Sequence, residues 1–180
     1  MSAEFITATL VSFRIRTLRA IIAILATSTF TTNAYATLDP GLPNSKLTPG
    51  FANPAVTQRT IGSTICVVGY TKTIRPASYY TTSLKKKQLA SGYNYQGDLS
   101  TADYEEDHLL PLEIGGHPTD ARNLWPEPRL VPRSAELKDK LENKIHLLIC
   151  SGKISLIVGQ SAFTVNWEKA YESYIGKLPD

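Results

Sequence analysis

The stretch "YEEDHLLPLEIGGHPTDARNLWPEP", residues 104–128, holds the features that decide the fold. Its first residues are typical of a strand, the glycines at 115–116 mark a turn, and a second extended piece ends at Pro126. It also carries an Asp-His pair at 107–108 and an asparagine at 123. The stretch is therefore either a well-capped surface loop or a fold-back that holds an imidazole and a carboxylate beside a metal ion.

Residues 134–150 form the clearest helix of the sequence. Ser134 is a credible N-cap, Glu136 lies in the first turn where the helix dipole favours it, and Ser151 and Gly152 end the helix. At about 100° per residue, two opposite stripes arise. The apolar stripe comprises Leu137, Leu141, Ile145 and Leu148, and the polar stripe comprises Asp139, Glu142, Asn143 and His146.

The remaining segments predict a mixture of extended and helical elements. Residues 37–58 are rich in proline and predict an extended lead-in. Residues 63–74 are rich in β-branched residues and predict one or two strands. Residues 81–92 predict a short helix, and residues 155–176 predict one or two helices. Two aromatic residues of that last segment, Trp167 and Tyr171, are expected in the core.

The N-terminal residues resemble a secretory signal. Residues 14–36 begin with three arginines, continue with a short apolar run and end in Ala34-Tyr35-Ala36, a small-x-small cleavage site. The apolar run is shorter than the roughly 20 residues that span a bilayer, although a membrane-tethered N-terminus is the alternative. We therefore expect a secreted or periplasmic bacterial protein.

Three sequence regions follow from this interpretation. Residues 1–36 are the signal peptide, residues 37–62 are an extended lead-in, and residues 63–180 are a single small domain. Loss of the leader removes more positive than negative charge from a chain of net charge +3. Any affinity for nucleic acid must then come from local basic patches.

The two cysteines, Cys66 and Cys150, both lie in the exported part. An oxidising compartment favours one disulfide between them, with two buried free thiols as the alternative. In the chain-entropy model such a bridge contributes up to about 4 kcal/mol. Two lone cysteines without a CxxC pair argue against a structural zinc ribbon.

Several motifs together resemble a known family. "NPAVTQRTIGSTICVVGYTKTIRP" (53–76), "DHLLPLEIGG" (107–116), "NLWPEP" (123–128) and "KDKLENKIHLLICSGKISL" (138–156) are similar to small secreted bacterial proteins of the HNH endonuclease type. The resemblance covers roughly residues 43–175. It implies an α+β fold with a ββα-metal core, flanking helices and one disulfide. It also implies a hydrolase that cleaves phosphodiester bonds.

The resemblance also implies roles for single residues. His108 matches the general base, Asp107 matches a carboxylate ligand of one divalent cation, and Asn123 matches the asparagine that holds the base in place. The last metal ligand of such nucleases comes from the helix, where this sequence departs from the plain motif. Candidates for this ligand, in order of preference, are Glu142, His146, Asp139 and Asn143.

Phosphodiester chemistry is consistent with these roles. Hydrolysis needs an activated water and a positive charge at the phosphate, and a neutral imidazole supplies the first near pH 7. Oxygen ligands favour Mg²⁺, with Mn²⁺ next, whereas a bound His146 shifts the expectation toward Zn²⁺ or Ni²⁺. Basic residues expected to contact nucleic-acid phosphates are Lys72, Arg75, Lys85, Lys86 and Lys87.

The sequence therefore predicts a secreted, metal-dependent endonuclease of DNA, or of RNA, with little sequence specificity. A non-catalytic nucleic-acid or metal-binding module is the first alternative, because the helix ligand is not unique. A secreted structural or interaction protein is the second. Under that reading the Asp-His pair at 107–108 only caps a turn, and the polar stripe is only the solvated side of a helix.

Overall fold

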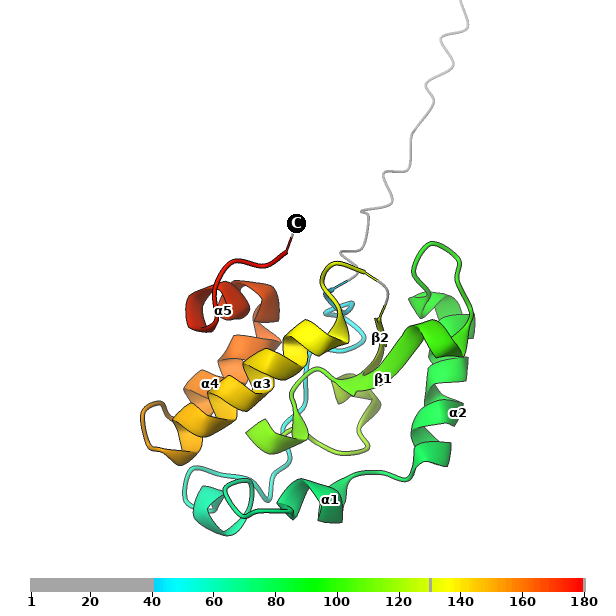
Figure 1. Ribbon diagram of the computed structural model, residues 1–180. Helices are drawn as coiled ribbons and strands as arrows, with labels where there is room; N and C mark the ends of the chain where they lie inside the picture. The colour runs from blue at the N-terminus through cyan, green and yellow to red at the C-terminus, as the bar shows by residue number, and fades with distance from the viewer. Residues whose placement is uncertain (1–40, 130, 180) are drawn as a thin grey trace, which may run out of the picture. The chain divides into compact units, whose positions relative to one another are not determined.

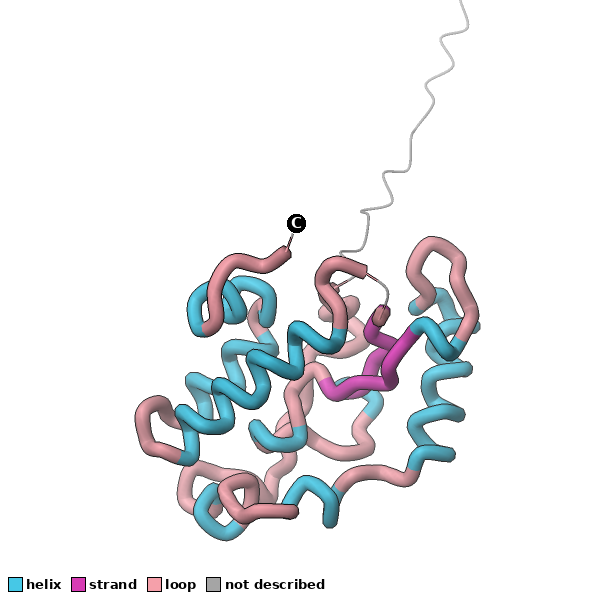
Figure 2. The backbone as a smooth tube through the Cα atoms, viewed as in Figure 1, coloured by secondary structure: helices cyan, strands magenta, loops and turns pink. Residues whose placement is uncertain are grey.

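The structure is a computed structural model that describes residues 41–129 and 131–179. The described residues form one small mixed domain of five α-helices and a two-stranded sheet (Figure 1, Figure 2). The expected signal peptide lies outside the described residues. Within them, no helix is both long and apolar enough to cross a membrane.

Two antiparallel strands, β1 (Tyr104–His108) and β2 (Leu124–Pro128), form the sheet, as the sequence predicts. Their register pairs Asp107 with Trp125, so residue 107 shares a face of the sheet with residues 125 and 127. Side chains alternate along a strand, so His108 lies on the opposite face. The side chains of Asp107 and His108 thus point to different parts of the molecule.

Two helices flank the hairpin on its two faces. Helix α3 (Ala135–Cys150) supplies a lysine that bonds to Asp107, and helix α2 (Ser78–Gln88) contacts both strands (Figure 1). The predicted helix at 134–150 is confirmed. The predicted helix at 81–92 begins earlier, at Ser78, and ends in a π-helical turn at Leu89–Tyr93.

The apolar side of α3 packs on the C-terminal helices α4 (Leu156–Thr164) and α5 (Trp167–Tyr174). Leu141 and Ile145 are fully buried, and a Cβ at Gly159 of α4 would lie 2.5 Å from a carbon of Ile149. The two helices therefore approach more closely than a larger residue at position 159 allows.

The expected core positions of Trp167 and Tyr171 are confirmed, because their exposed fractions are 0% and 6%. The indole of Trp167 also donates a 2.6 Å hydrogen bond to the carbonyl of Gly41. Val56 belongs to the same core. The described part of the lead-in, residues 41–62, is therefore packed against the domain that follows it.

The prediction of strands at residues 63–74 is wrong. A 3₁₀ turn at Ile61–Ser63, further turns and the short helix α1 (Tyr70–Ile74) occupy this segment. Its valines are not core residues, since Val68 is fully exposed. The β-branched composition predicted strands, but a strand also needs a pairing partner, and the described residues offer none here, although Ile65 is buried in the core.

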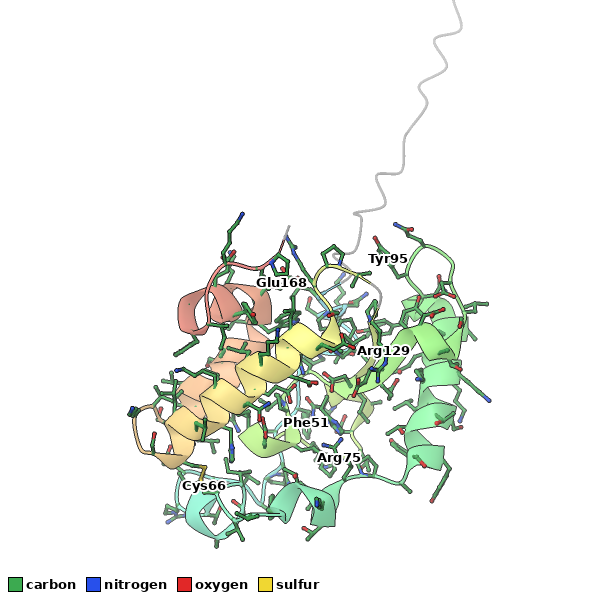
Figure 3. All side chains as sticks on the ribbon, viewed as in Figure 1. Phe51, Cys66, Arg75, Tyr95, Arg129 and Glu168 are labelled. Carbon is green, nitrogen blue, oxygen red and sulfur yellow. A yellow bond between two sulfur atoms is a disulfide. The ribbon has the colours of Figure 1, made fainter. Side chains whose placement is uncertain are left out.

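The disulfide between Cys66 and Cys150 is confirmed, with a Cα–Cα distance of 5.5 Å. It joins this turn-rich segment to the last residue of α3 (Figure 3). In His146, one helical turn before Cys150, Nε2 lies 2.8 Å from the carbonyl oxygen of Ile65. Because a carbonyl only accepts, the ring nitrogen Nε2 donates. The segment is thus fixed to α3 at two points.

Candidate functional site

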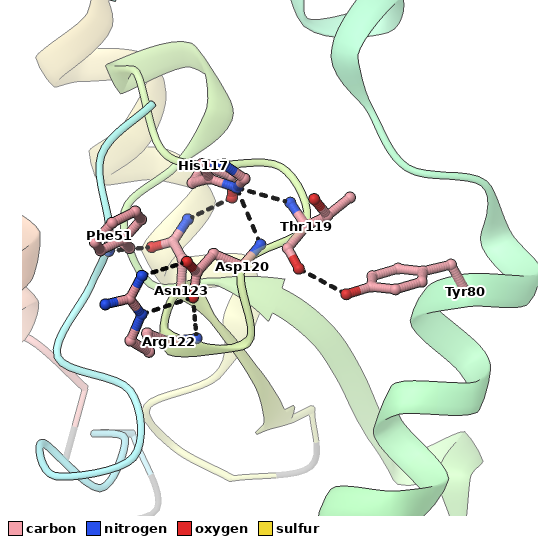
Figure 4. Close-up of polar contacts among 7 residues, drawn as sticks. All are labelled: Phe51, Tyr80, His117, Thr119, Asp120, Arg122 and Asn123. Atoms are coloured by element: carbon pink, nitrogen blue, oxygen red, sulfur yellow. Dashed lines mark hydrogen bonds and ion pairs between the residues drawn. The ribbon is translucent and has the colours of Figure 1, made fainter. Parts of the chain in front are cut away.

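Asn123 fixes the loop between the two strands. Its side chain is fully buried and accepts hydrogen bonds from the backbone of Leu110 (2.9 Å) and Phe51 (3.2 Å). Its amide donates to the carbonyl of Leu110 (2.9 Å) and to that of His117 (3.0 Å). Figure 4 shows the bond to His117. An amide is the side chain that offers an acceptor and two donors in one plane. Asn123 therefore closes residues 109–122 into a fixed turn.

The glycines that sequence analysis assigns to the turn are both required by geometry. Gly115 has a φ of 84°, in the left-handed region. A Cβ at Gly116 would lie 1.7 Å from the carbonyl oxygen of Leu110 and 2.8 Å from the Asn123 amide nitrogen. The Asn123 bonds thus depend on the missing side chain at position 116.

His117 and Asp120 complete the turn. The Nδ1 atom of His117 accepts hydrogen bonds from the backbone of Thr119 (3.3 Å) and Asp120 (3.0 Å) (Figure 4). Arg122 donates to the Asp120 carboxylate, and these hydrogen bonds lower the pKa of Asp120 to about 2. The turn is therefore cross-linked on its solvent side as well as at its buried centre.

His108 ends β1 and is 5% exposed. Its Nε2 lies 2.9 Å from the carbonyl oxygen of Pro118, within the loop that Asn123 closes. Since a carbonyl only accepts, Nε2 carries the hydrogen and the neutral ring keeps a lone pair on Nδ1. Burial lowers the pKa of His108. The imidazole is therefore neutral near pH 7 and is a proton acceptor at Nδ1.

His108 forms part of the wall of a cleft of about 250 Å³ on the α2 side of the sheet. Three basic side chains line the same cleft: Arg75, Lys85 and Arg129. Figure 3 labels two of them, Arg75 before α2 and Arg129 after β2. The cleft brings one neutral base together with several positive charges, as an anionic substrate requires.

The three cations are engaged to different degrees. Lys85 is half-buried and donates to the carbonyls of Thr101 (2.8 Å) and Tyr104 (2.7 Å). Arg129 forms a 2.6 Å ion pair with Glu105. The exposed guanidinium of Arg75 has no hydrogen bond or ion pair within residues 41–129 and 131–179. Arg75 is therefore the cation of the cleft that is most available to a ligand.

Glu106 also lines this cleft. Burial, together with the negative charge of Asp107, raises the pKa of Glu106 to about 8, although the nearby Lys85 lowers it. A carboxyl group with this pKa is mostly neutral at pH 7. Its buried carboxyl group then adds no negative charge to the wall of the cleft.

Not every predicted basic contact lies at this cleft. Lys72, Lys86 and Lys87 are exposed and do not line it. Arg75 and Lys85 line the cleft, and the ammonium of Lys85 donates a hydrogen bond to the backbone carbonyl of Thr101, ahead of β1. The run at 85–87 is therefore divided: its first member fixes α2 to the hairpin, and the other two lie on the solvated side of α2.

On the opposite face of the sheet, Asp107 and Glu142 converge as the resemblance requires of two ligands. The point at which they converge is occupied by Lys138 of α3. Its Nζ lies 2.5 Å from Oδ2 of Asp107, 2.5 Å from Oε1 of Glu142 and 2.9 Å from the carbonyl oxygen of His108. Because each oxygen lies 2.5 Å from Nζ, Oδ2 of Asp107 and Oε1 of Glu142 are separated by no more than twice 2.5 Å.

Lys138 is fully buried and charged. Burial by itself lowers the pKa of the ammonium, but Asp107 and the neighbouring carboxyl groups of Glu142 and Glu127 raise it well above its ordinary value. Burial likewise raises the pKa of Asp107, but the ammonium of Lys138 and its hydrogen bond overcome this and lower it. A lysine–aspartate ion pair is thus the stable state of this face.

Glu127 is a fourth member of the group and was not singled out from the sequence. It is 0% exposed, and no hydrogen-bond donor of the described residues reaches either of its oxygens. Burial and the charge of Asp107 raise its pKa well above the ordinary value. We name Asp107, Glu127, Glu142 and Lys138 the buried quartet.

The other helix candidates are directed elsewhere. Asp139 is exposed, and its backbone carbonyl accepts a 2.8 Å hydrogen bond from the exposed side chain of Asn143. His146 bonds to Ile65 instead of approaching Asp107. Of the four candidates, the structure brings only Glu142 to Asp107.

The residues as placed do not fit a divalent cation. The oxygen donors of Asp107 and Glu142 suit a hard ion, but the Lys138 ammonium stands between them. Within residues 41–129 and 131–179, no group of three or more His, Cys, Asp or Glu side chains is arranged to hold a metal ion.

Lys138, Glu127 and Arg129 were missed because their roles depend on tertiary pairing. Lys138 lies four residues before Glu142, so an i,i+4 charge pair is visible in the sequence. Its complete burial is not, because buried lysines are rare. Glu127 could have been found by pairing residues 104–128 as a hairpin, which puts residues 107 and 127 on one face.

Comparisons of the chain with protein-family models, with curated proteins and with solved structures gave no match.

Proposed function

We propose that the chain is an endonuclease of the ββα type that hydrolyses phosphodiester bonds of DNA, or of RNA, with His108 as general base. One observation carries the proposal. A buried, neutral imidazole, oriented through Nε2 by the Pro118 carbonyl, lines a cleft with Arg75 and Arg129. The order β1, cross-linked loop, β2, α3 supports a ββα core.

The reaction follows from these side chains. Nδ1 of His108 takes a proton from a water molecule as the water oxygen attacks phosphorus, and the bond from phosphorus to the leaving oxygen breaks. The leaving oxygen takes a proton from solvent, and His108 returns its proton to solvent. Arg75 and Arg129 offset the charge of the phosphate. Asn123 is a positioning residue, since it holds the loop that carries the Pro118 carbonyl.

Little sequence specificity is expected. The cleft is lined by charged and hydroxyl side chains, which suit phosphates better than base edges. The disulfide supports an oxidising compartment, secreted or periplasmic, as the place of action.

We propose that cleavage requires a divalent cation, with Mg²⁺ expected first, and the EDTA arm of the experiment tests this requirement. No step above passes through the cation, because the ammonium of Lys138 fills the point between Asp107 and Glu142.

The test is cleavage of supercoiled plasmid by the purified protein with Mg²⁺, Mn²⁺, Zn²⁺ or EDTA, beside His108→Ala. Cleavage that His108→Ala abolishes supports the enzyme, and the EDTA arm shows whether a cation is needed. Cleavage that persists in His108→Ala contradicts the role of His108.

One observation favours a second candidate, a non-catalytic nucleic-acid-binding module. The resemblance expects a metal where the structure has Lys138, and a chain of this fold without the metal could still bind phosphates through Arg75. Retention of DNA without cleavage under every condition would select this module. Absence of both would leave a structural or interaction protein.

A further inference from the structure

The buried quartet has the composition of a cation site. Oxygen atoms of Asp107 and Glu142 and the carbonyl oxygen of His108 all point at one position, the Nζ atom of Lys138. Carboxylate and carbonyl oxygens are the ligands that hard cations prefer. The quartet differs from a metal site in one respect: its positive charge is covalently attached to α3.

Glu127 is the independent evidence that the position is built for a cation. Its side chain is fully buried on the same sheet face as Asp107, and its oxygens receive no hydrogen bond from the described residues. Apolar packing would be better served by an apolar residue, because a buried carboxyl group without a donor is costly. A cation beside it offsets this cost.

The distances show how little must change for an ion to replace the ammonium. Nζ lies 2.5 Å from two oxygens, whereas Mg²⁺ requires about 2.0–2.1 Å. Each oxygen would move by well under 1 Å to contact a small ion at the same position. The space that such an ion needs is the space that the lysine side chain takes.

We infer that Lys138 is the resident cation of the buried quartet: it excludes divalent cations from Asp107, Glu127 and Glu142, and its removal creates a site for one. The inference goes beyond the proposed nuclease function, because it concerns cation binding in the absence of substrate. A cation that supports cleavage would therefore be held elsewhere than between Asp107 and Glu142.

The test is binding of Mn²⁺ alone to the full chain, followed by the electron paramagnetic resonance of free Mn²⁺. Five proteins are compared: the wild type, Asp107→Asn, Lys138→Ala, Lys138→Ala with Glu127→Gln, and Lys140→Ala. Lys140 is an exposed lysine of the same helix, so its variant is the matched control.

Lys138→Ala is expected to bind about one Mn²⁺ with a dissociation constant on the order of 10⁻⁴ to 10⁻³ M, like that of the weak calcium sites of extracellular modules. Added Glu127→Gln is expected to weaken this binding at least about tenfold, since a carboxyl ligand is replaced by an amide. The wild type and Lys140→Ala are expected to bind no Mn²⁺ at Asp107. Any residual Mn²⁺ binding by the wild type is therefore expected to remain in Asp107→Asn.

Two results would overturn the inference. The first is Mn²⁺ binding to the wild type that is lost in Asp107→Asn, because the ammonium would then not exclude the ion. The second is a folded Lys138→Ala protein that binds no Mn²⁺. If Lys138→Ala does not fold without metal, the wild-type arm alone decides. None of these results depends on cleavage, so failure of the inference and failure of the nuclease proposal are distinguished.

Discussion

The side-chain amide of Asn123 bonds to both backbone polar groups of Leu110, accepting from its N–H and donating to its C=O, each at 2.9 Å. Two residues that are 13 positions apart are thereby joined as a pair of strand residues would be. The Pro118 carbonyl that orients His108 belongs to the loop closed by this contact. The buried amide therefore links the fold of the loop to the candidate base.

Asn123→Ala is expected to destabilise the protein by at least about 2 kcal/mol, because two buried backbone groups of Leu110 lose their partners at roughly 1–3 kcal/mol each. Urea unfolding followed by tryptophan fluorescence measures the change. Asn143→Ala is the matched control, since Asn143 is an exposed asparagine of α3. Equal stability of the two variants would show that the Asn123 bonds do not hold the loop.

Gly116→Ala is expected to be among the most destabilising single-methyl changes in the domain. The added carbon would lie 1.7 Å from the carbonyl oxygen of Leu110, so the backbone must move and the Asn123 bonds must break. Gly62→Ala meets no atom within 4 Å and serves as the control. Thermal unfolding of both variants is the measurement, and similar midpoints would contradict the described turn.

Lys138→Met is expected to cost about 3–5 kcal/mol, because removal of one partner leaves the charge of Asp107 buried without compensation. Lys140→Met, on the solvated side of the helix, is expected to change stability by less than about 0.5 kcal/mol. Chemical unfolding of both proteins in EDTA checks this. A neutral effect of Lys138→Met would mean that the buried ion pair is not formed.

His108 is expected to make stability depend on pH below its ordinary pKa of 6.5. Burial lowers the pKa of His108 in the folded protein, so the unfolded chain binds a proton first as the pH falls. The stability contributed by the neutral ring is present above pH 6.5 and is lost as the pH falls through the folded pKa. His108→Gln, which can still donate to the Pro118 carbonyl, lacks this titration.

The measurement is the free energy of unfolding of wild type and His108→Gln between pH 8 and pH 5, roughly one and a half units either side of 6.5. Their difference is expected to be constant above pH 6.5 and to shift against the wild type below it. A constant difference over the whole range would show that the folded pKa of His108 is not lowered.

Local signals made much of the fold predictable. The hairpin, the helix that ends at Cys150, the helical character of residues 155–176 and the disulfide follow from turn glycines, caps, periodicity and cysteine count. Residues 63–74 failed because their composition predicts strands only if a partner strand exists. In the structure, the disulfide and the His146 bond to Ile65 fix this segment instead.

The candidate site was predictable in part, for a related reason. The Asp-His pair, Asn123 and the glycines lie in one short stretch, so their grouping is local. The partner of Asp107 is not local: Lys138 follows it by 31 positions and was assigned to neither stripe of the helix. Helical periodicity sorts residues by polarity, and it cannot indicate that a lysine is buried by an acidic sheet face.

The most direct test of the proposed function is the rate of DNA cleavage by wild type and His108→Gln under single-turnover conditions at pH 8. Matching circular dichroism spectra establish that both proteins are folded. The glutamine keeps the bond to Pro118 but cannot take a proton, so the rate is expected to fall about 10²–10⁴-fold. Equal rates, with cleavage clearly above the protein-free control, would contradict His108 as the general base.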